Sequence, residues 1–365
     1  MAKKNNNINS EDIKYIKLAY EQAVINIGST QKNPSVGCVI VNNNSVISSG
    51  RTSYNGRPHA EANALKEKIN FKGSDLYVTL EPCSHYGKTP PCIKKIINKK
   101  IKRVIFSIND TDKRSKNLAY KKLKKNKINV KTFLNKKFAK NFYQSYFLQF
   151  TNSFPFIDAK LAVSKDYFTI HKKKQWITNV NSRNVGNFLR SKYDCIVSTA
   201  KTVNVDNSML DCRIEGLEKK SPTVVIIDRT FKIKTNLKMF KDKSRKFLIL
   251  TQNSKNFKEK YFKKIGVNVI KFKKFNFSLD EKYNIFLYLK KLGFNRILVE
   301  CGVEFTNEIL KNNLVKNFYL FKSYFKLKKN GKNNSNLHLI RSLNLRYKNK
   351  VKINLNGDSL YKVQL

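Results

Sequence analysis

The strongest constraint on how this chain can fold comes from one histidine and two cysteines in its first third. These residues are His59, Cys83 and Cys92, and Glu61 lies two positions after the histidine. One imidazole and two thiolates are ligands that a tetrahedral Zn²⁺ accepts, and three protein ligands leave its fourth position open for water. The ion lowers the pKa of that water toward neutrality, and the Glu61 carboxylate can carry protons to and from it. The pattern therefore predicts a catalytic zinc site suited to hydrolytic removal of an amine from a heterocycle.

Both ends of this stretch are expected to lie where a helix begins. Arg57-Pro58 disfavours helix before His59, and the residues that follow, 60–68, are mostly strong helix formers. Pro90-Pro91 marks a second helix start, where free N–H groups would stabilise a thiolate at Cys92. A lone cysteine or histidine is usually buried or solvated without a metal. The prediction therefore depends on the combination, which matches the His-x-Glu and Pro-Cys pattern of zinc deaminases.

Four short segments extend this pattern: NPSVG at 33–37, HAE at 59–61, TLEPCSH at 79–85 and TPPC at 89–92. Together they resemble the family of bifunctional deaminase/reductases of riboflavin biosynthesis. The long insert between the two cysteines separates the chain from nucleic-acid and cytidine deaminases, whose cysteine ligands are two residues apart. The resemblance implies that His59, Cys83 and Cys92 bind zinc and that Glu61 is the proton shuttle. It also implies that Asn33 hydrogen-bonds the pyrimidine of a small substrate, a diaminopyrimidine with a phosphoribosylamino group.

The net charge of the chain is extreme. It is +49 over 365 residues, which would ordinarily predict a polyanionic partner. Lysine, however, is spread along the whole chain together with excess Asn, Ile, Phe and Tyr, as AT-rich codon bias would produce. Nucleic-acid readers instead cluster basic residues on one face. We therefore expect no specific nucleic-acid partner, and we expect a homo-oligomer.

Cysteine usage and the N-terminus indicate the compartment. The spacing of the six cysteines suggests no disulfide framework, and the polar N-terminus lacks the apolar segment of a secretion signal. No uncharged run is long enough to cross a bilayer. We expect a cytoplasmic protein without membrane contact, with Cys38, Cys195 and Cys301 in apolar cores.

The length predicts two domains, which we place at 1–150 and 151–365, joined by a linker around 152–155. The first should begin with a basic tail over 1–9 and a helix from Ser10 to Gly28. A hairpin that turns at 42–44 should follow. The strands of this first domain are predicted at 36–41, 45–49, 75–79, 103–107 and 128–133. Its later helices are predicted at 91–98, 115–125 and 136–150. This alternation implies a helix-covered sheet, and by resemblance a cytidine-deaminase-like α/β/α domain.

The second half again alternates strands and helices. Strands are predicted at 156–162, 195–198, 223–228, 247–251, 267–271 and 296–300, and helices at 181–191, 279–292 and 304–311. Several strands are almost entirely apolar, as buried parallel strands are. No Gly-x-Gly-x-x-Gly fingerprint is present. The residues alone indicate an α/β domain that binds a small phosphorylated ligand.

The segments KLAVSKD at 160–166, QWIT at 175–178 and VECG at 299–302 resemble the dihydrofolate-reductase-like half of the same family. The resemblance implies an NADPH site formed by Ala162, Trp176, Thr202, Asp206 and the loop from Gly302. It implies that the sugar phosphate of the substrate is held by Arg190, Leu210, Arg213 and Glu300. Lys174 stands where the family has a substrate-binding serine, and a lysine can meet a phosphate as a point charge.

Several positions depart from the family pattern in this half. Tyr167 replaces a glycine, Asn207-Ser208 replaces an Asp-Pro pair, and the loop after Glu300 keeps only Gly302. The interpretation is a two-step enzyme, zinc-dependent deamination followed by NADPH-dependent reduction of the ribosyl group to ribityl. Three alternatives stay open: a deaminase with an inactive structural C-terminal half, a deaminase of nucleic-acid bases, and a zinc-stabilised binding protein without turnover.

Overall fold

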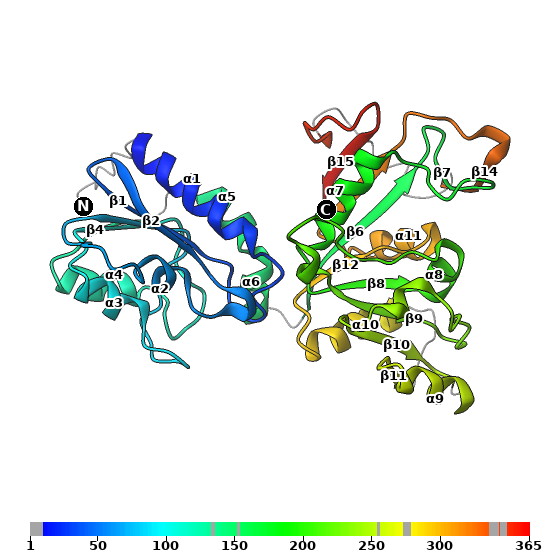
Figure 1. Ribbon diagram of the computed structural model, residues 1–365, viewed down its shortest axis with the longest axis horizontal. Coiled ribbons are helices and arrows are strands. Elements are labelled where there is room, and N and C mark those ends of the chain that lie inside the picture. The colour runs from blue at the N-terminus through cyan, green and yellow to red at the C-terminus, as the bar shows by residue number, and fades with distance from the viewer. Residues whose placement is uncertain are drawn as a thin grey trace. The chain divides into compact units, whose positions relative to one another are not determined.

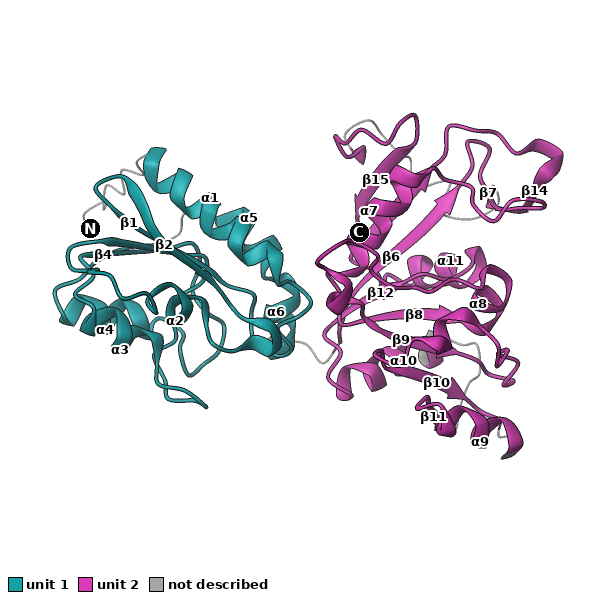
Figure 2. Cartoon of the chain, in the orientation of Figure 1, with its two compact units in different colours: residues 1–153 teal, residues 154–365 magenta. Residues whose placement is uncertain are grey.

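The computed structural model describes residues 10–132, 136–151, 154–253, 256–272, 279–335, 343 and 349–365. The chain divides into two compact units, Met1–Ser153 and Phe154–Leu365 (Figures 1 and 2). The predicted basic tail, Phe133 and the linker residues Asn152 and Ser153 lie outside the described residues. Among the helices of the described part, none is both long and apolar enough to span a bilayer.

The first unit is built on a five-stranded sheet with the order β2-β1-β3-β4-β5. Its strands are β1 (Gly37–Asn42), β2 (Ser45–Arg51), β3 (Asp75–Val78), β4 (Arg103–Phe106) and β5 (Asn129–Thr132). β1 runs antiparallel to β2 and β3, while β3, β4 and β5 are parallel. The predicted hairpin is confirmed, since Asn43 and Asn44 have φ values of 47° and 59°. Two-residue hairpin turns need such positive φ values, and asparagine tolerates them.

Helices cover both faces of this sheet (Figure 1). They are α1 (Ser10–Ile25), α2 (Ala60–Ala64), α3 (Cys92–Asn98), α4 (Leu118–Lys125), α5 (Lys136–Phe142) and α6 (Gln144–Thr151), with a 3-10 turn η1 (Tyr54–Gly56). A Cβ on Gly37 would lie 1.8 Å from the carbonyl oxygen of Ala19 in α1, and one on Gly50 would lie 2.4 Å from that of Ala60 in α2. Glycine therefore lets each helix approach the sheet closely.

Two predicted helices of this unit differ from the structure. The helix expected from 115 begins only at Leu118, because Asn117 has a left-handed φ of 61°. The single closing helix expected over 136–150 is divided into α5 and α6 at Tyr143. Backbone hydrogen bonds from Tyr143 to Ala139 and from Phe147 to Tyr143 nevertheless cross the division. The two helices therefore still present side chains at helical spacing.

The second unit contains an eight-stranded sheet with the order β11-β10-β9-β8-β12-β6-β13-β15. Its strands are β6 (Phe156–Val163), β8 (Cys195–Thr199), β9 (Thr223–Ile227), β10 (Phe247–Thr251), β11 (Asn268–Lys271), β12 (Arg296–Val299), β13 (Asn317–Lys322) and β15 (Ser359–Gln364). All neighbours are parallel except β15, which is antiparallel to β13. The six predicted strands are confirmed, and β13 and β15 were missed.

The remaining elements of this unit are two strands and several helices. β7 (Phe168–His171) pairs with β14 (Gly331–Asn334). The helices are α7 (Val180–Arg190), α8 (Ala200–Asp206), α9 (Asn256–Lys264), α10 (Leu279–Lys291) and α11 (Val303–Lys311), with 3-10 turns η2 (Glu218–Lys220), η3 (Lys238–Lys241) and η4 (Lys328–Asn330). Alternate residues of the central strands enter separate apolar clusters, as Val197 and Ile196 of β8 do. Both faces of the sheet are therefore covered.

A buried carboxylate ties α1 to the sheet of the first unit. Asp12 is fully buried, and its oxygens lie 3.1 Å from Arg103 Nη1 and 3.0 Å from Lys131 Nζ. The hydroxyl of Tyr77 donates to Asp12 Oδ1 at 2.9 Å. Arg103 also pairs with Asp75 at 2.6 Å. A buried charge with one partner removed is strongly destabilising, so this network should set much of the unit's stability.

We predict that Asp12→Asn lowers the free energy of unfolding of the first unit by about 2 kcal/mol, because Arg103 and Lys131 lose a buried counter-charge while staying partly solvated. Denaturation followed by circular dichroism measures the change. The one tryptophan, Trp176, lies in the second unit, so its fluorescence transition should not move. Glu67→Gln, at an exposed acid, is the matched control. Coinciding circular-dichroism transitions of variant and wild type would contradict the prediction.

Candidate active sites

The three predicted zinc ligands lie together in the first unit. One ligand atom from each of His59, Cys83 and Cys92 lies within 4.8 Å of the other two. His59 Nδ1 is 3.6 Å from Cys83 Sγ and 3.5 Å from Cys92 Sγ. Zinc bonds of about 2.0 Å to nitrogen and about 2.3 Å to sulfur place N and S about 3.6 Å apart in a tetrahedron. The residues therefore fit a zinc ion, with Nδ1 as the imidazole ligand.

Local structure brings these ligands from three different segments. His59 is the residue before α2, Cys92 is the first residue of α3, and Cys83 lies in the loop after β3. The backbone N–H of Cys92 donates to Cys83 Sγ at 3.2 Å, so the start of α3 stabilises the sulfur of Cys83. A hydrogen bond with the Cys92 thiol is the largest of the causes that lower the pKa of Cys83 to about 4. A low pKa favours the thiolate, which is the form of cysteine that binds a metal.

Glu61 lies beside this ligand set, as the second residue of α2, and its side chain is buried. Burial raises the pKa of Glu61 to about 7, and the negative charge of Cys83 adds to the effect. A carboxyl group that titrates near neutrality can both accept and return a proton at the operating pH. The geometry therefore suits Glu61 to general acid–base work next to the metal.

Two further residues shape the surroundings of the metal ligands. Asn33 Nδ2 donates to the carbonyl of Gly56 at 2.9 Å, in the turn that leads toward His59. Glu81, two residues before Cys83, accepts backbone N–H groups of Asp110, Asn117 and Ala119 at 3.0–3.1 Å. Glu81 belongs to the TLEPCSH segment, but we predicted no role for it from the sequence. Its place directly before Pro-Cys at the end of a strand was the available signal.

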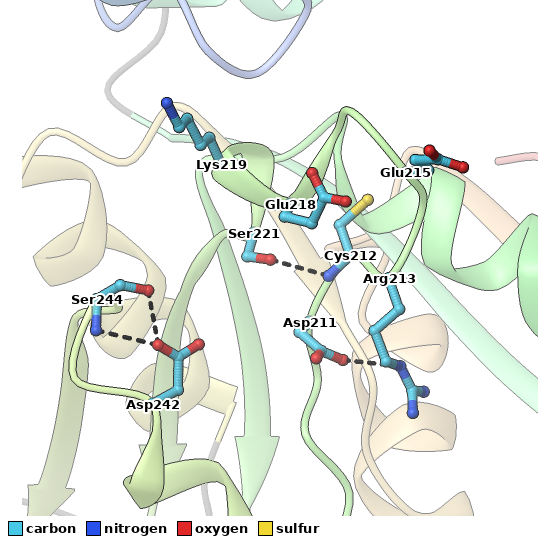
Figure 3. A pocket seen from close by; sticks show the side chains of 9 residues that line it. All are labelled: Asp211, Cys212, Arg213, Glu215, Glu218, Lys219, Ser221, Asp242 and Ser244. Carbon is cyan, nitrogen blue, oxygen red and sulfur yellow. Dashed lines mark hydrogen bonds and ion pairs between the residues drawn. The ribbon is translucent and has the colours of Figure 1, made fainter.

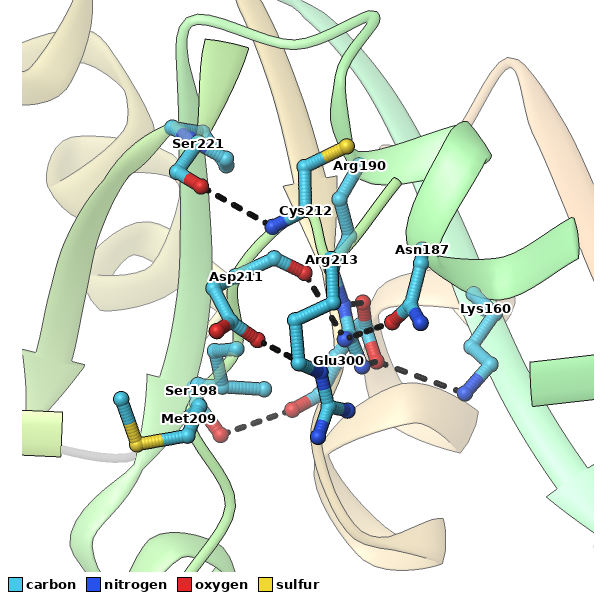
Figure 4. Close-up of polar contacts among 12 residues, drawn as sticks. Lys160, Asn187, Arg190, Ser198, Met209, Asp211, Cys212, Arg213, Ser221 and Glu300 are labelled. Atoms are coloured by element: carbon cyan, nitrogen blue, oxygen red, sulfur yellow. Dashed lines mark hydrogen bonds and ion pairs between the residues drawn. The ribbon is translucent and has the colours of Figure 1, made fainter. Parts of the chain in front are cut away.

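A buried charge cluster of the second unit lies where β12 ends, beside Lys160 within β6 (Figure 4). Arg190 Nε and Nη2 donate to the two carboxylate oxygens of Glu300 at 2.7 and 3.0 Å. Lys160 Nζ lies 3.4 Å from Glu300 Oε2. Burial alone would raise the pKa of Glu300, but Arg190 and Lys160 outweigh it and lower this pKa to about 2. Lys160 was not predicted as a site residue, although a lysine within an apolar strand was a signal.

Two of the predicted NADPH residues, Thr202 and Gly302, follow the carboxyl ends of the neighbouring strands β8 and β12. Thr202 Oγ1 accepts the backbone N–H of Gly302 at 3.1 Å and lies 2.9 Å from Thr199 Oγ1. Thr199 caps the start of α8, and Gly302 is the residue before α11. Two helix N-termini therefore meet beyond neighbouring parallel strands, which is where open α/β sheets bind ligands.

The other predicted residues of this half are more dispersed. Ala162 lies on β6, paired with Phe321. Asp206 ends α8, and its carbonyl accepts from Gln175 at 3.5 Å. Trp176 is 42% exposed, with the Arg183 guanidinium 5.1 Å from its ring.

The backbone N–H of the exposed Lys174 donates to His171 Nδ1 at 3.0 Å. Leu210 is buried, with a left-handed φ of 50°. Neither observation brings Lys174 into contact with the charge cluster.

Arg213 pairs with Asp211 at 3.1 Å and lines an open pocket of about 520 Å³ (Figure 3). The other lining residues include Cys212, Glu215, Glu218 and Asp242. Arg190 Nη1 donates to the carbonyl of Asp211 at 3.1 Å. The segment that carries Arg213 is therefore anchored to the charge cluster.

Comparison with known proteins finds a family match for each unit. Residues 9–108 match the cytidine and deoxycytidylate deaminase zinc-binding region, and residues 155–323 match the RibD C-terminal domain. The riboflavin biosynthesis protein RibD of Buchnera aphidicola is 34% identical over 327 residues, which cover 85% of this chain and 86% of that protein. The RibD of Aquifex aeolicus is 31% identical over 313 residues, with coverage of 85% and 86%.

Solved structures of similar proteins share the whole fold. A diaminohydroxyphosphoribosylaminopyrimidine deaminase/5-amino-6-(5-phosphoribosylamino)uracil reductase of Thermotoga maritima is 25% identical, with a TM-score of 0.78 and coverage of 97% of this chain and 98% of that one. RibD of Acinetobacter baumannii has a TM-score of 0.79 with the same coverage and, at 23% identity, supports the fold alone. The chain belongs to the RibD family of riboflavin biosynthesis, in which a zinc-dependent deaminase is joined to an NADPH-dependent reductase.

Proposed function

We propose that the first unit deaminates a pyrimidine that carries a phosphoribosylamino group, with Glu61 as its catalytic acid and base. His59 Nδ1 and the sulfurs of Cys83 and Cys92 would hold zinc, which when bound supplies an activated water. Glu61 would carry one proton of the attacking water to the ring nitrogen and the second to the departing amine, so that the ring carbon keeps the oxygen and ammonia leaves. The observation that carries this proposal is a buried carboxyl group, with its pKa near neutrality, beside a ligand set of tetrahedral spacing.

The second unit would then reduce the ribosyl group of the deaminated product. NADPH supplies the hydride, so the protein contributes mainly binding and orientation. Thr202 and Gly302, at two helix starts, would contact the cofactor together with Ala162, Trp176 and Asp206. Arg190, Leu210, Arg213 and Glu300 would hold the substrate, and we keep Lys174 as a predicted phosphate contact. The support is the convergence of Lys160, Arg190 and Glu300 at the carboxyl edge that also carries Thr202 and Gly302.

Membership of the family does not favour a deaminase of nucleic-acid bases or a binding protein without turnover. The predicted homo-oligomer and cytoplasmic location stay predictions. Light scattering of the purified protein measures the oligomeric state.

The reductase proposal is tested directly by anaerobic NADPH oxidation with the deaminated substrate, and an absence of oxidation would restore the interpretation of a structural second half.

Glu61→Gln should keep one zinc per chain but lower ammonia release from the phosphoribosyl substrate by at least about a hundredfold, because the amide cannot transfer protons. NADPH oxidation with deaminated substrate should be unchanged, which reports intact folding. Cys92→Ser is the contrasting variant and should lose zinc as well as deamination. Metal analysis and an ammonia assay measure both. Substantial deamination by the Gln variant would exclude Glu61 as the proton shuttle.

Gly302→Ala should raise the KM for NADPH by about tenfold while leaving the protein as stable as wild type. Among the described residues, a Cβ at this position would have one neighbour within 4 Å, Thr202 Oγ1 at an ordinary 3.7 Å. The added methyl group would instead obstruct the close approach of a cofactor phosphate to the backbone. Zinc content and deamination serve as internal controls. An unchanged KM for NADPH would mean that the cofactor does not approach this loop.

A further inference from the structure

Three side chains at helical spacing, near the C-terminal end of the first unit, form hydrogen bonds with three different loops of that unit. The hydroxyl of Tyr143 lies 2.5 Å from Thr79 Oγ1 and donates to the carbonyl of Ser35 at 3.3 Å. Tyr146, one turn later, donates its hydroxyl proton to Asp110 Oδ1 at 3.0 Å. Gln149 Nε2 donates to the carbonyl of Lys32 at 3.1 Å. Positions three residues apart share one face of a helix, so a single face makes all these contacts.

Each contacted loop adjoins the candidate deaminase site. Lys32 and Ser35 flank Asn33, the proposed pyrimidine-binding residue. Thr79 Oγ1 accepts the N–H of Gly37 at 3.1 Å, which extends the contact of Tyr143 to the start of β1. The N–H of Asp110 donates to Glu81, two residues before the ligand Cys83. The helix face therefore contacts two loops beside the site: the loop that contains Asn33, and the loop that is hydrogen-bonded to Glu81.

We infer that Tyr143, Tyr146 and Gln149 are positioning residues for deamination, which hold the 30–37 loop and the 110–112 loop in register with the metal site. This inference rests on the proposed function of the first unit. A reactive constellation has to be held to within about 0.5 Å by its supporting contacts. The hydroxyl of Tyr143 is the central contact because its residue is almost fully buried and it bonds two loops at once.

The aromatic rings have a separate structural role. Tyr143 packs against Tyr20, Phe142 and Tyr146 with ring centroids 5.0–6.5 Å apart. Substitution of tyrosine by phenylalanine keeps this packing and removes only the hydroxyl. Tyr143→Phe therefore separates loop positioning from core packing. Tyr120→Phe on α4, where the ring also packs against the core of this unit, is the matched control.

The test combines kinetics with hydrogen exchange. Tyr143→Phe should raise the KM of deamination by about tenfold with a much smaller change in kcat, at unchanged zinc content and unchanged NADPH oxidation with deaminated substrate. The amides of Asn33 and Gly37 should exchange faster, because their loop loses the hydrogen bond to the carbonyl of Ser35, and the hydroxyl of Thr79, which accepts the N–H of Gly37, loses its contact with Tyr143. Tyr120→Phe should change neither.

An unchanged KM together with unchanged exchange overturns the inference. Loss of zinc or of reductase activity also overturns it, because the hydroxyl would then stabilise the fold in general. Faster exchange at an unchanged KM shows that the loops are held without consequence for substrate, and it too contradicts positioning. If wild-type protein released no ammonia, the proposed function would fail, and hydrogen exchange would still decide whether Tyr143 holds the loops.

Discussion

The convergence of one imidazole nitrogen and two sulfurs within 4.8 Å is the constraint on which the first unit depends. The ligands come from the start of α2, the loop after β3 and the start of α3, so no single element can place them. Residues of other segments therefore have to hold these three ligands in position. Glu81 does so with three backbone N–H groups, and Gly50 does so by letting α2 approach β2 closely. The site is therefore a property of the whole sheet and its edge loops.

The departures of the second half from its family pattern do not disrupt the turns in which they occur. Tyr167 adopts a left-handed φ of 66°, where a glycine would be unstrained, yet its N–H still donates to the carbonyl of Ser164 at 3.0 Å. Asp166 keeps the loop in place, since its carboxylate accepts the N–H groups of Leu327 and Lys328 at 2.9 and 2.8 Å. Asn207 ends α8 with a φ of 43°, which asparagine tolerates better than most residues. These turns are therefore formed without the residues that the family pattern has at these positions.

Local chemistry was predictable from the sequence, and distant pairing was not. The zinc ligands, the Asn43-Asn44 turn and the six apolar strands of the second unit each have a short-range signal. We found no short-range sequence signal for β13, β14 and β15, because their pairing depends on partners far along the chain. The pairing of Arg190 with Glu300 spans 110 residues, so the sequence showed two charged residues but not that they neutralise each other. The division between α5 and α6 was missed because neither a glycine nor a proline marks it.

Two buried glutamates in one chain show how environment assigns a carboxyl group its role. Burial is the largest influence on Glu61 and raises its pKa to about 7. Glu300 is equally buried, but Arg190 and Lys160 hold its pKa at about 2. A group with the first property can exchange protons at neutral pH, whereas a group with the second stays an anion. Hydrolysis of an amine needs proton transfer, and reduction of the ribosyl group needs a proton as well as the hydride, which a carboxyl group held as an anion cannot supply. Glu300 therefore contributes a fixed charge that orients Arg190 and Lys160, and it is suited to holding substrate rather than to acid–base catalysis.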